Sequence, residues 1–494
     1  MAHLGLSTTI ESADVLEKTI QRFRKKGIKL PTFAELEKPC LIDEATVKRL
    51  EDIDPHSPDP LNLYRIHWYN RPDSRGFADC PHSIELPTEL TGVEARIVVM
   101  VGAHFPMIDA HKVLAAYGCL APRLITGQFD PQKHKAIWPS TGNYCRGGVA
   151  VSRIMDCRGV AILPEEMSQE RFNWLKSWCL AEEDIIATPG CESNVKEIYD
   201  QCNQLDVCPE NIIFNQFSEF GNALIHYTCT GKALEHVFQK LCEKNGNLHL
   251  KAFISATGSA GTLAAGDYLK ENYHSQIVAV EALQCPTLLY NGFGGHNIQG
   301  IGDKHVPLVH NAMNTDFVVA ISDQNTDHLF TLFNMDAGKE YLQQRKRVPA
   351  STCEDLKYFG LSSICNILAA IKYAKYHKLG SDDVLMTVAT DSAEMYQSEK
   401  QKVLGKEEFA PFNNICAAEI YSQYLAGLGT DHMQELTYRD KERIFNLGYY
   451  TWVEQQGISI EDFNKRKDPS FWKKLRNYVD EWDRLIDDFN QRLS

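Results

Sequence analysis

The sequence lacks long apolar runs and a net positive charge, and each absence excludes a class of protein. The apolar run at residues 95–105 is interrupted by Arg96 and His104 and is shorter than the ~20 residues that cross a bilayer. No basic segment followed by an apolar one opens the chain, so we expect neither a membrane protein nor a secreted one. A formal net charge of −14 disfavours nucleic acid as a partner.

The sequence also lacks the closely paired cysteines of a zinc site or a disulfide framework. Its 15 cysteines are odd in number and scattered, and none stands three residues from another. This usage is typical of reduced thiols in a cytosol. We therefore expect a cytoplasmic protein without a structural metal.

What is present indicates an α/β protein with more than one lobe. A chain of 494 residues exceeds what one hydrophobic core usually organises. Within residues 91–404, which we expect to form the catalytic core, short β-rich runs alternate with helical patterns, which indicates βαβ units and parallel sheets. Residues 1–90 are expected to form an N-terminal arm, with an amphipathic helix and a Pro- and Asp-rich stretch at residues 52–60. Residues 405–494 are expected to form a helical C-terminal extension that packs on the body or on a second subunit.

Four short motifs follow one another in an order that suits a pyridoxal phosphate (PLP) site. Lys112 begins a helical pattern, Ser140–Asn143 form a turn, Gly258–Thr262 form a small-residue loop between a predicted strand and helix, and Asp391–Ser392 follow a late strand. Backbone amides at such a strand–helix junction favour an anion. Each motif alone has an ordinary structural explanation, such as a surface lysine, a turn or a helix cap. Together they supply the amine, the phosphate loop and the polar ring contacts that PLP needs.

Longer stretches make the pattern specific. With residues 216–222, 226–231, 296–302 and 360–363, the motifs resemble the fold type II PLP-dependent enzymes of the tryptophan synthase β family, and most closely the cysteine synthases (O-acetylserine sulfhydrylases). The resemblance covers roughly residues 90–400. It implies two parallel-sheet α/β lobes with PLP between them, the smaller lobe nested at about residues 115–240, and a homodimer.

The resemblance also implies roles for individual residues. Lys112 would form the internal aldimine and act as the catalytic residue, Asn143 would bond the cofactor's 3′-oxygen, and Ser392 would meet the pyridine nitrogen. The phosphate would be held by Gly258, Ser259, Ala260, Gly261 and Thr262. Ser140, Thr141, Asn143 and Gln216 would bind the substrate carboxylate, and the predicted substrate site also includes Gly142, Tyr144, Gly300 and Asp303.

The departures from the family pattern fall mainly on the substrate side. Tyr144 stands where the sulfhydrylases have a small threonine, and Asp303, Lys304 and His305 replace small and apolar residues. Charged groups there would recognise a polar substrate side chain or act as acid and base on the leaving group. Ala260 replaces a glycine of the phosphate loop.

The sequence therefore predicts a lyase or transferase of amino-acid metabolism, similar to a cysteine synthase of cysteine biosynthesis. It would act on a small L-amino acid by β-replacement or α,β-elimination through an aminoacrylate intermediate. An ammonia-lyase of the serine, threonine or diaminopropionate type in the same fold is an alternative. A non-catalytic PLP-binding or interaction protein is a second alternative, and a racemase would require another base that the sequence does not identify.

Overall fold

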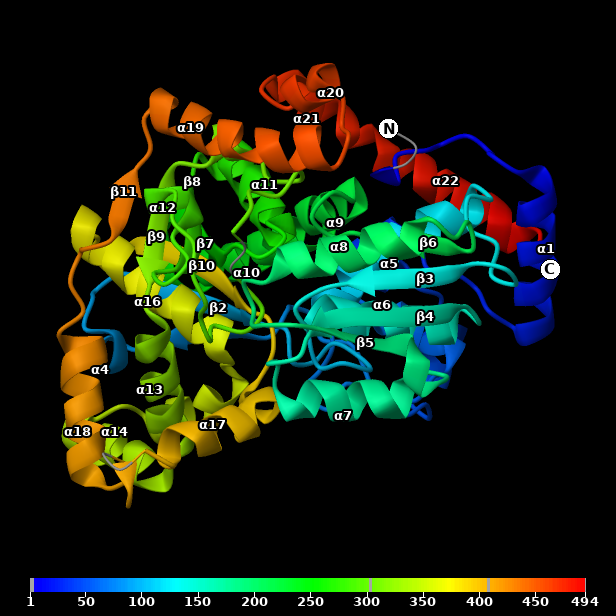
Figure 1. Cartoon of the computed structure of the whole chain (residues 1–494). Coiled ribbons are helices and arrows are strands. Elements are labelled where there is room, and N and C mark those ends of the chain that lie inside the picture. Colours follow the sequence, from blue (N-terminus) through cyan, green and yellow to red (C-terminus); the bar gives the residue numbers. More distant parts are fainter. Residues whose placement is uncertain (1–3, 302–303, 407–408, 494) are drawn as a thin grey trace.

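Two β-sheets organise the molecule, shown as a computed structural model in Figure 1; the structure describes residues 4–301, 304–406 and 409–493. The larger sheet has seven strands in the order β1-β2-β10-β7-β8-β9-β11. Its strands are β1 (Ser83–Leu86), β2 (Arg96–Val101), β7 (His249–Ala256), β8 (Gln276–Ala282), β9 (Phe317–Ile321), β10 (Asp383–Ala389) and β11 (Met433–Glu435). The five central strands run parallel, and β1 and β11 are antiparallel edges.

The smaller sheet is inserted in the chain between β2 and β7. Its four strands run parallel in the order β5-β4-β3-β6. They are β3 (Lys135–Pro139), β4 (Arg158–Pro164), β5 (Ile185–Thr188) and β6 (Asn211–Ile213). In Figure 1 this sheet lies beside the larger one, so the molecule has a small and a large lobe.

The central strands are continuously apolar because parallel strands are buried on both faces. Residues 97–101 of β2 and 384–389 of β10 are buried throughout. The prediction of parallel α/β lobes is confirmed. The helical tail is predicted less completely, because residues 433–435 leave the helices and pair with β9 as strand β11.

Helices cover both sheets. Those of the core are α4 (Thr88–Thr91), α5 (Lys112–Ile125), α6 (Asn143–Ile154), α7 (Gln169–Trp178), α8 (Val195–Asp206), α9 (Phe220–Ile225), α10 (Gly231–Asn245), α11 (Ala264–Tyr273), α12 (Thr287–Tyr290), α13 (Asp323–Asn334), α14 (Asp336–Lys346), α15 (Ala350–Asp355), α16 (Leu361–His377) and α17 (Gln397–Leu404). Helix α5 is buried from Val113 to Ile125. Such an all-round apolar helix belongs in a core, where it packs against α6 and α9.

The two ends of the chain pack on each other, where Figure 1 shows α22 beside α1. The terminal helices are α1 (Ala13–Lys26), α2 (Phe33–Glu37), α3 (Glu44–Leu50), α18 (Asn414–Tyr421), α19 (Tyr438–Tyr449), α20 (Ile460–Lys465), α21 (Pro469–Leu475) and α22 (Asn477–Gln491). The rings of Phe23 and Phe489 meet edge to face at 5.5 Å. Asn490 bonds both the N–H and the carbonyl of Leu30, at 3.1 and 2.7 Å. The first and last helices of the chain therefore pack against each other.

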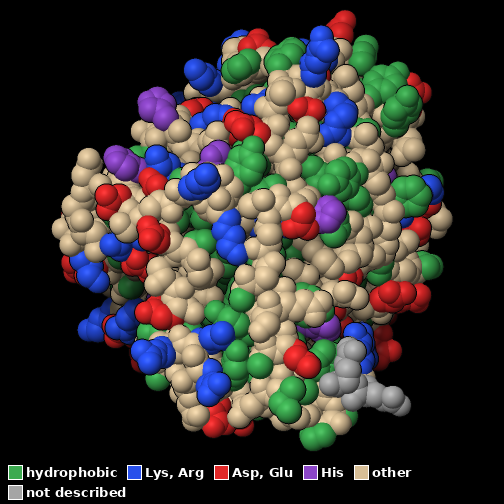
Figure 2. All heavy atoms as spheres, turned by 90° about the vertical axis from the view of Figure 1, so that its left-hand side faces the viewer, with side chains coloured by type: hydrophobic (Ala, Val, Ile, Leu, Met, Phe, Trp, Pro, Cys, Tyr) green, Lys and Arg blue, Asp and Glu red, His purple; other side chains and the backbone are tan. Residues whose placement is uncertain are grey.

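The face on the left of Figure 1 carries side chains of both charges, mixed with hydrophobic ones, as Figure 2 shows. No basic patch of the kind that follows a phosphate backbone stands out on this face. Among the described helices, none combines the length and apolarity of a membrane span.

Candidate functional site

Lys112 is the first residue of α5, as the sequence predicted. Its Nζ donates a hydrogen bond to Ser259 Oγ at 3.3 Å. Burial lowers the pKa of this amine from 10.5 to about 8, because a low-dielectric environment disfavours the charged form. The amine is thus suited to exchange protons near neutral pH.

The loop Gly258–Thr262 follows β7. Its last two residues begin a short 3₁₀ helix, Gly261–Leu263, which leads into α11. None of the described residues accepts a hydrogen bond from the backbone N–H of Gly258, Ser259, Ala260 or Thr262. Ala260 adopts a left-handed conformation, with φ of +62°. Unpartnered donors at the start of a helix favour an anion.

Side chains from the small lobe hold this loop in place. Asn222 Nδ2 donates to Ser259 Oγ at 3.0 Å, and a Cβ on Gly261 would lie 2.2 Å from Asn222 Oδ1. A larger residue at position 261 would therefore require Asn222 or the loop to shift. On the other side, His111 Nε2 and Thr262 Oγ1 are 3.3 Å apart, so the residue before Lys112 also contacts the loop.

The turn after β3 forms the opposite wall. Gly142 has φ of +144°, and its N–H donates to Ser140 Oγ at 3.0 Å. Gln216 Nε2 donates to the same hydroxyl at 3.4 Å. A Cβ at Gly142 would lie 2.4 Å from Arg171 Nε, so this glycine permits the close approach of an arginine.

These segments enclose one narrow cavity. It is lined by Lys112, Ser140, Thr141, Asn143, Tyr144, Gln216, Phe217, Gly258, Ser259, Gly300 and Thr390. The structure thus brings together nine residues of the predicted site. Gly142, Ala260, Gly261, Thr262 and Ser392 do not line the cavity, and Asp303 lies outside the residues that the structure describes.

Two predicted residues are engaged in unexpected ways. The Tyr144 hydroxyl approaches the Cys119 thiol, and burial raises the pKa of the Tyr144 hydroxyl well above its usual value. The Ser392 hydroxyl accepts a bond from the Glu394 N–H at 3.4 Å and so caps the short helix that follows. Among the described residues, no hydrogen bond joins the Tyr144 hydroxyl to Lys112.

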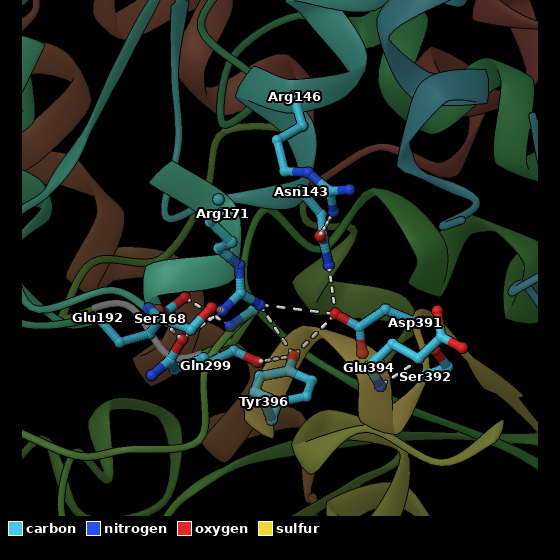
Figure 3. Close-up of polar contacts among 12 residues, drawn as sticks. Asn143, Arg146, Ser168, Arg171, Glu192, Gln299, Asp391, Ser392, Glu394 and Tyr396 are labelled. Atoms are coloured by element: carbon cyan, nitrogen blue, oxygen red, sulfur yellow. Dashed lines mark hydrogen bonds and ion pairs between the residues drawn. The ribbon is translucent and has the colours of Figure 1, made fainter. Parts of the chain in front are cut away.

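A buried polar network beside the cavity was not predicted. Asn143 Nδ2 donates to Asp391 Oδ2 at 2.7 Å, and its Oδ1 accepts from Arg146 Nη1 at 3.1 Å (Figure 3). The Tyr396 hydroxyl donates to the same Asp391 oxygen at 2.7 Å. The sequence pattern assigns no role to Asp391 beyond its place before Ser392. Its network depends on residues far away in the sequence, such as Asn143.

Arg171 of α7 is the centre of this network, as Figure 3 shows. It contacts Asp391 at 3.5 Å and donates to the Tyr396 hydroxyl at 2.9 Å and to Gln299 Oε1. Arg171 and Asp391 are both fully buried. Burial opposes the charged guanidinium, but Tyr396, Asp391 and Glu192 outweigh it and raise the pKa of Arg171. The network joins the small lobe to the large one.

The charged loop after Gly300 is only partly described. Lys304 lies 3.9 Å from Glu197 in an ion pair, and His305 packs against Tyr199, with ring centroids 5.6 Å apart. Both side chains thus contact the small lobe near α8. All 15 cysteines are free thiols, and no cluster of potential metal ligands occurs among the described residues.

Comparisons with known proteins agree with the predicted resemblance. No family model matches the chain. The chain is 28% identical over 262 residues to a cysteine synthase of Staphylococcus aureus (strain MRSA252), which covers 53% of this chain and 74% of the relative. It is 24% identical over 312 residues to the cystathionine beta-synthase of Saccharomyces cerevisiae, covering 60% and 56%. The resemblance to cysteine synthases is confirmed.

Solved structures agree on the fold. A hydrogen sulfide-producing enzyme of Fusobacterium nucleatum aligns with a TM-score of 0.54 and 22% identity over 68% of this chain and 92% of that one. A cysteine synthase of Entamoeba histolytica aligns with a TM-score of 0.54 and 19% identity over 69% and 92%. At this level of identity the structures show the fold alone, and the prediction of fold type II is confirmed.

Proposed function

We propose that the chain is a PLP-dependent enzyme that replaces or eliminates the group on the β-carbon of a small L-amino acid, in the manner of a cysteine synthase. The observation that carries the proposal is the position of Lys112. Its amine, with a pKa lowered to about 8, lies at hydrogen-bond distance from a loop of unpartnered backbone donors. An amine beside an anion site, inside a cavity between two α/β lobes, is what PLP requires.

The residues present fit the cofactor. The free N–H groups of the loop 258–262 would hold its phosphate at the start of the helix that leads into α11. Asn143 would face its ring from the opposite wall. The resemblance implies that Ser392, which follows β10 and does not line the cavity, would meet the ring nitrogen. When bound, PLP withdraws electrons from the α-carbon of the amino acid, so that a group on the β-carbon can leave.

The side chains of the cavity have separate tasks in this proposal. Lys112 accepts and returns the proton of the α-carbon, because its lowered pKa leaves a large share of the amine neutral near pH 8. Ser140, Thr141 and Gln216 converge on one wall, where they would bind the substrate carboxylate. The narrow cavity excludes bulk water, which strengthens these polar contacts.

The names of the relatives support both outcomes of the reaction. The sequence relatives are named synthases, which suggests replacement, whereas one structural neighbour is named a hydrogen sulfide-producing enzyme, and release of sulfide from a β-carbon is compatible with replacement and with elimination. Both begin with loss of a group from the β-carbon. They differ in whether a nucleophile then adds.

The decisive experiment combines absorbance with product analysis. Purified protein is mixed with PLP, and its visible absorbance is recorded as O-acetyl-L-serine, L-cysteine, L-serine, L-threonine or 2,3-diaminopropionate is added, with and without sulfide or a thiol. A spectral change that sulfide or a thiol reverses, with a new thioether or cysteine as product, supports replacement. Pyruvate or another keto acid formed without a thiol supports elimination.

Lys112→Ala is the control for this experiment. We expect this variant to lose the cofactor absorbance band that wild type shows. Its turnover should fall by a factor on the order of a thousand or more, because the lysine is both the covalent group and the acid–base group. A wild-type protein without a cofactor band would contradict the proposal and favour a binding or interaction role.

We further propose a cytoplasmic homodimer. The free thiols support a reducing compartment. Light scattering of the purified protein would measure the mass of the assembly, and a mass near that of one chain would contradict the dimer.

A further inference from the structure

Glu192 is a buried carboxylate that the roles above do not use. It lies between β5 and α8 of the small lobe and is 0% exposed. Its Oε1 accepts a hydrogen bond from the Gly300 N–H at 2.7 Å. The Thr141 hydroxyl bonds the same carboxyl group. Glu192 does not line the cavity itself, but both of its partners do.

These two partners belong to different walls. Thr141 follows β3 in the small lobe, whereas Gly300 lies between β8 and β9 of the large lobe. Gly300 has φ of +99°, and a Cβ on Gly258 would lie 3.2 Å from the Gly300 carbonyl oxygen. The Gly300 segment therefore also lies against the phosphate loop. One carboxyl group thus contacts the small-lobe wall and the segment that covers the loop.

Charge balance alone does not explain Glu192. Arg171, the nearby cation, is already paired with Asp391 and bonded to Tyr396. Moreover, Glu192 Oε2 is buried and has no partner of good hydrogen-bond geometry among the described residues. A buried oxygen that lacks a well-formed hydrogen bond lowers stability, and residues that break such rules concentrate at functional sites.

We propose that Glu192 is a positioning residue, which ties the Thr141 and Gly300 walls together and so holds the cavity in the arrangement that receives the amino-acid substrate. This inference rests on the proposed function. The operative contact is the bond from the Gly300 N–H to Oε1, an acceptor that glutamine also offers. Burial raises the pKa of Glu192 to about 8 against the opposing charge of Arg171, so the side chain need not be ionised to accept this bond.

The test compares Glu192→Ala and Glu192→Gln with a matched pair at Glu281. Glu281 is also buried, also accepts backbone N–H bonds, from Leu288 and Leu289 at 2.8 Å, and also has a pKa raised by burial to about 8. Neither Leu288 nor Leu289 lines the cavity, so these bonds do not connect Glu281 to the cavity wall. The holoenzyme of each variant is assayed for KM and kcat, and hydrogen exchange is measured over residues 139–145 and 297–301.

We expect Glu192→Ala to raise the KM for the amino acid roughly tenfold or more, with a much smaller change in kcat, as for loss of a buried hydrogen bond. Exchange should increase in both segments. Glu192→Gln should restore KM to within about threefold of wild type, because it keeps the acceptor. Glu281→Ala and Glu281→Gln should leave KM and the exchange of both segments unchanged.

Equal effects of the Glu192 and Glu281 variants would overturn the inference, as would a Glu192→Gln variant as impaired as Glu192→Ala. A wild-type protein without turnover would instead refute the proposed function. In that case hydrogen exchange still decides on Glu192: increased exchange in both walls for Glu192→Ala supports the tie, and unchanged exchange rejects it.

Discussion

The Lys112 side of the cavity and the polar network beside the cavity are built differently. The Lys112 side consists of a helix start and a loop of backbone N–H groups, each formed by a short continuous segment. The polar network between the lobes consists of charged and amide side chains from α7, from the segment after β8 and from the segment after β10. The first presents binding groups from local backbone geometry, whereas the second depends on the relative position of two lobes. A change in the network should therefore affect stability before it affects cofactor binding.

The largest effect is expected for Arg171→Met, which removes the centre of the network between the lobes. Asp391 would keep a buried charge without its cation, and loss of one partner of a buried pair typically costs about 3–5 kcal/mol. Urea unfolding with and without PLP measures the loss. Arg492→Met is the control, because Arg492 pairs with Glu17 at the surface and should cost only about 0–1 kcal/mol. Similar losses for both variants would contradict the distinction.

Gly261→Ala tests the other side. The new Cβ would lie 2.2 Å from Asn222 Oδ1, so Asn222 or the loop must shift, and overpacking of this kind costs about 1–3 kcal/mol. Because Asn222 holds Ser259, we expect phosphate and PLP to bind about tenfold more weakly. A tenfold change in Kd corresponds to about 1.4 kcal/mol of binding free energy.

Gly380→Ala is the matched substitution, since nothing lies within 4 Å of a Cβ there. Titration of both variants with PLP and with inorganic phosphate compares them. Unaltered affinity in Gly261→Ala would show that the loop tolerates the shift and that its geometry is less strict than the structure indicates.

The smallest effect concerns the pH dependence of stability. The pKa of Lys112 is about 8 in the folded protein, below its ordinary 10.5, so between these values the unfolded chain binds the additional proton. The contribution of Lys112 to stability therefore rises with pH across this window. Relative to Lys112→Met, cofactor-free wild type should gain about 1–2 kcal/mol between about pH 7 and about pH 9.5. Urea unfolding at both pH values measures the difference, and a constant difference would indicate an amine of ordinary pKa.

The sequence predicted the parts of the site that local patterns encode. Lys112 at a helix start and the small-residue loop after β7 could be predicted because they stand in one fixed order with the other motifs, although each alone has an ordinary structural explanation. Arg171 and Glu192 left no such signal. A charged residue in an amphipathic segment normally faces solvent, and only the fold shows that these two are buried between the lobes.

The chain ends illustrate the same limit. The sequence predicted a helix in the N-terminal arm and helices in the tail, and the structure contains both. It did not predict that Asn490 would bond Leu30 across almost the whole chain, or that residues 433–435 would complete the large sheet. Neither contact has a periodic pattern of its own.

The sequence by itself determined the alternation of strands and helices in the core and the order of the binding motifs, because hydrophobic periodicity and backbone preferences act over a few residues. Only the tertiary structure decided which charges are buried together and which side chains join the two lobes. Such contacts connect residues more than a hundred positions apart, such as Arg171 with Gln299 and Asp391, and their energies depend on burial that no local pattern specifies.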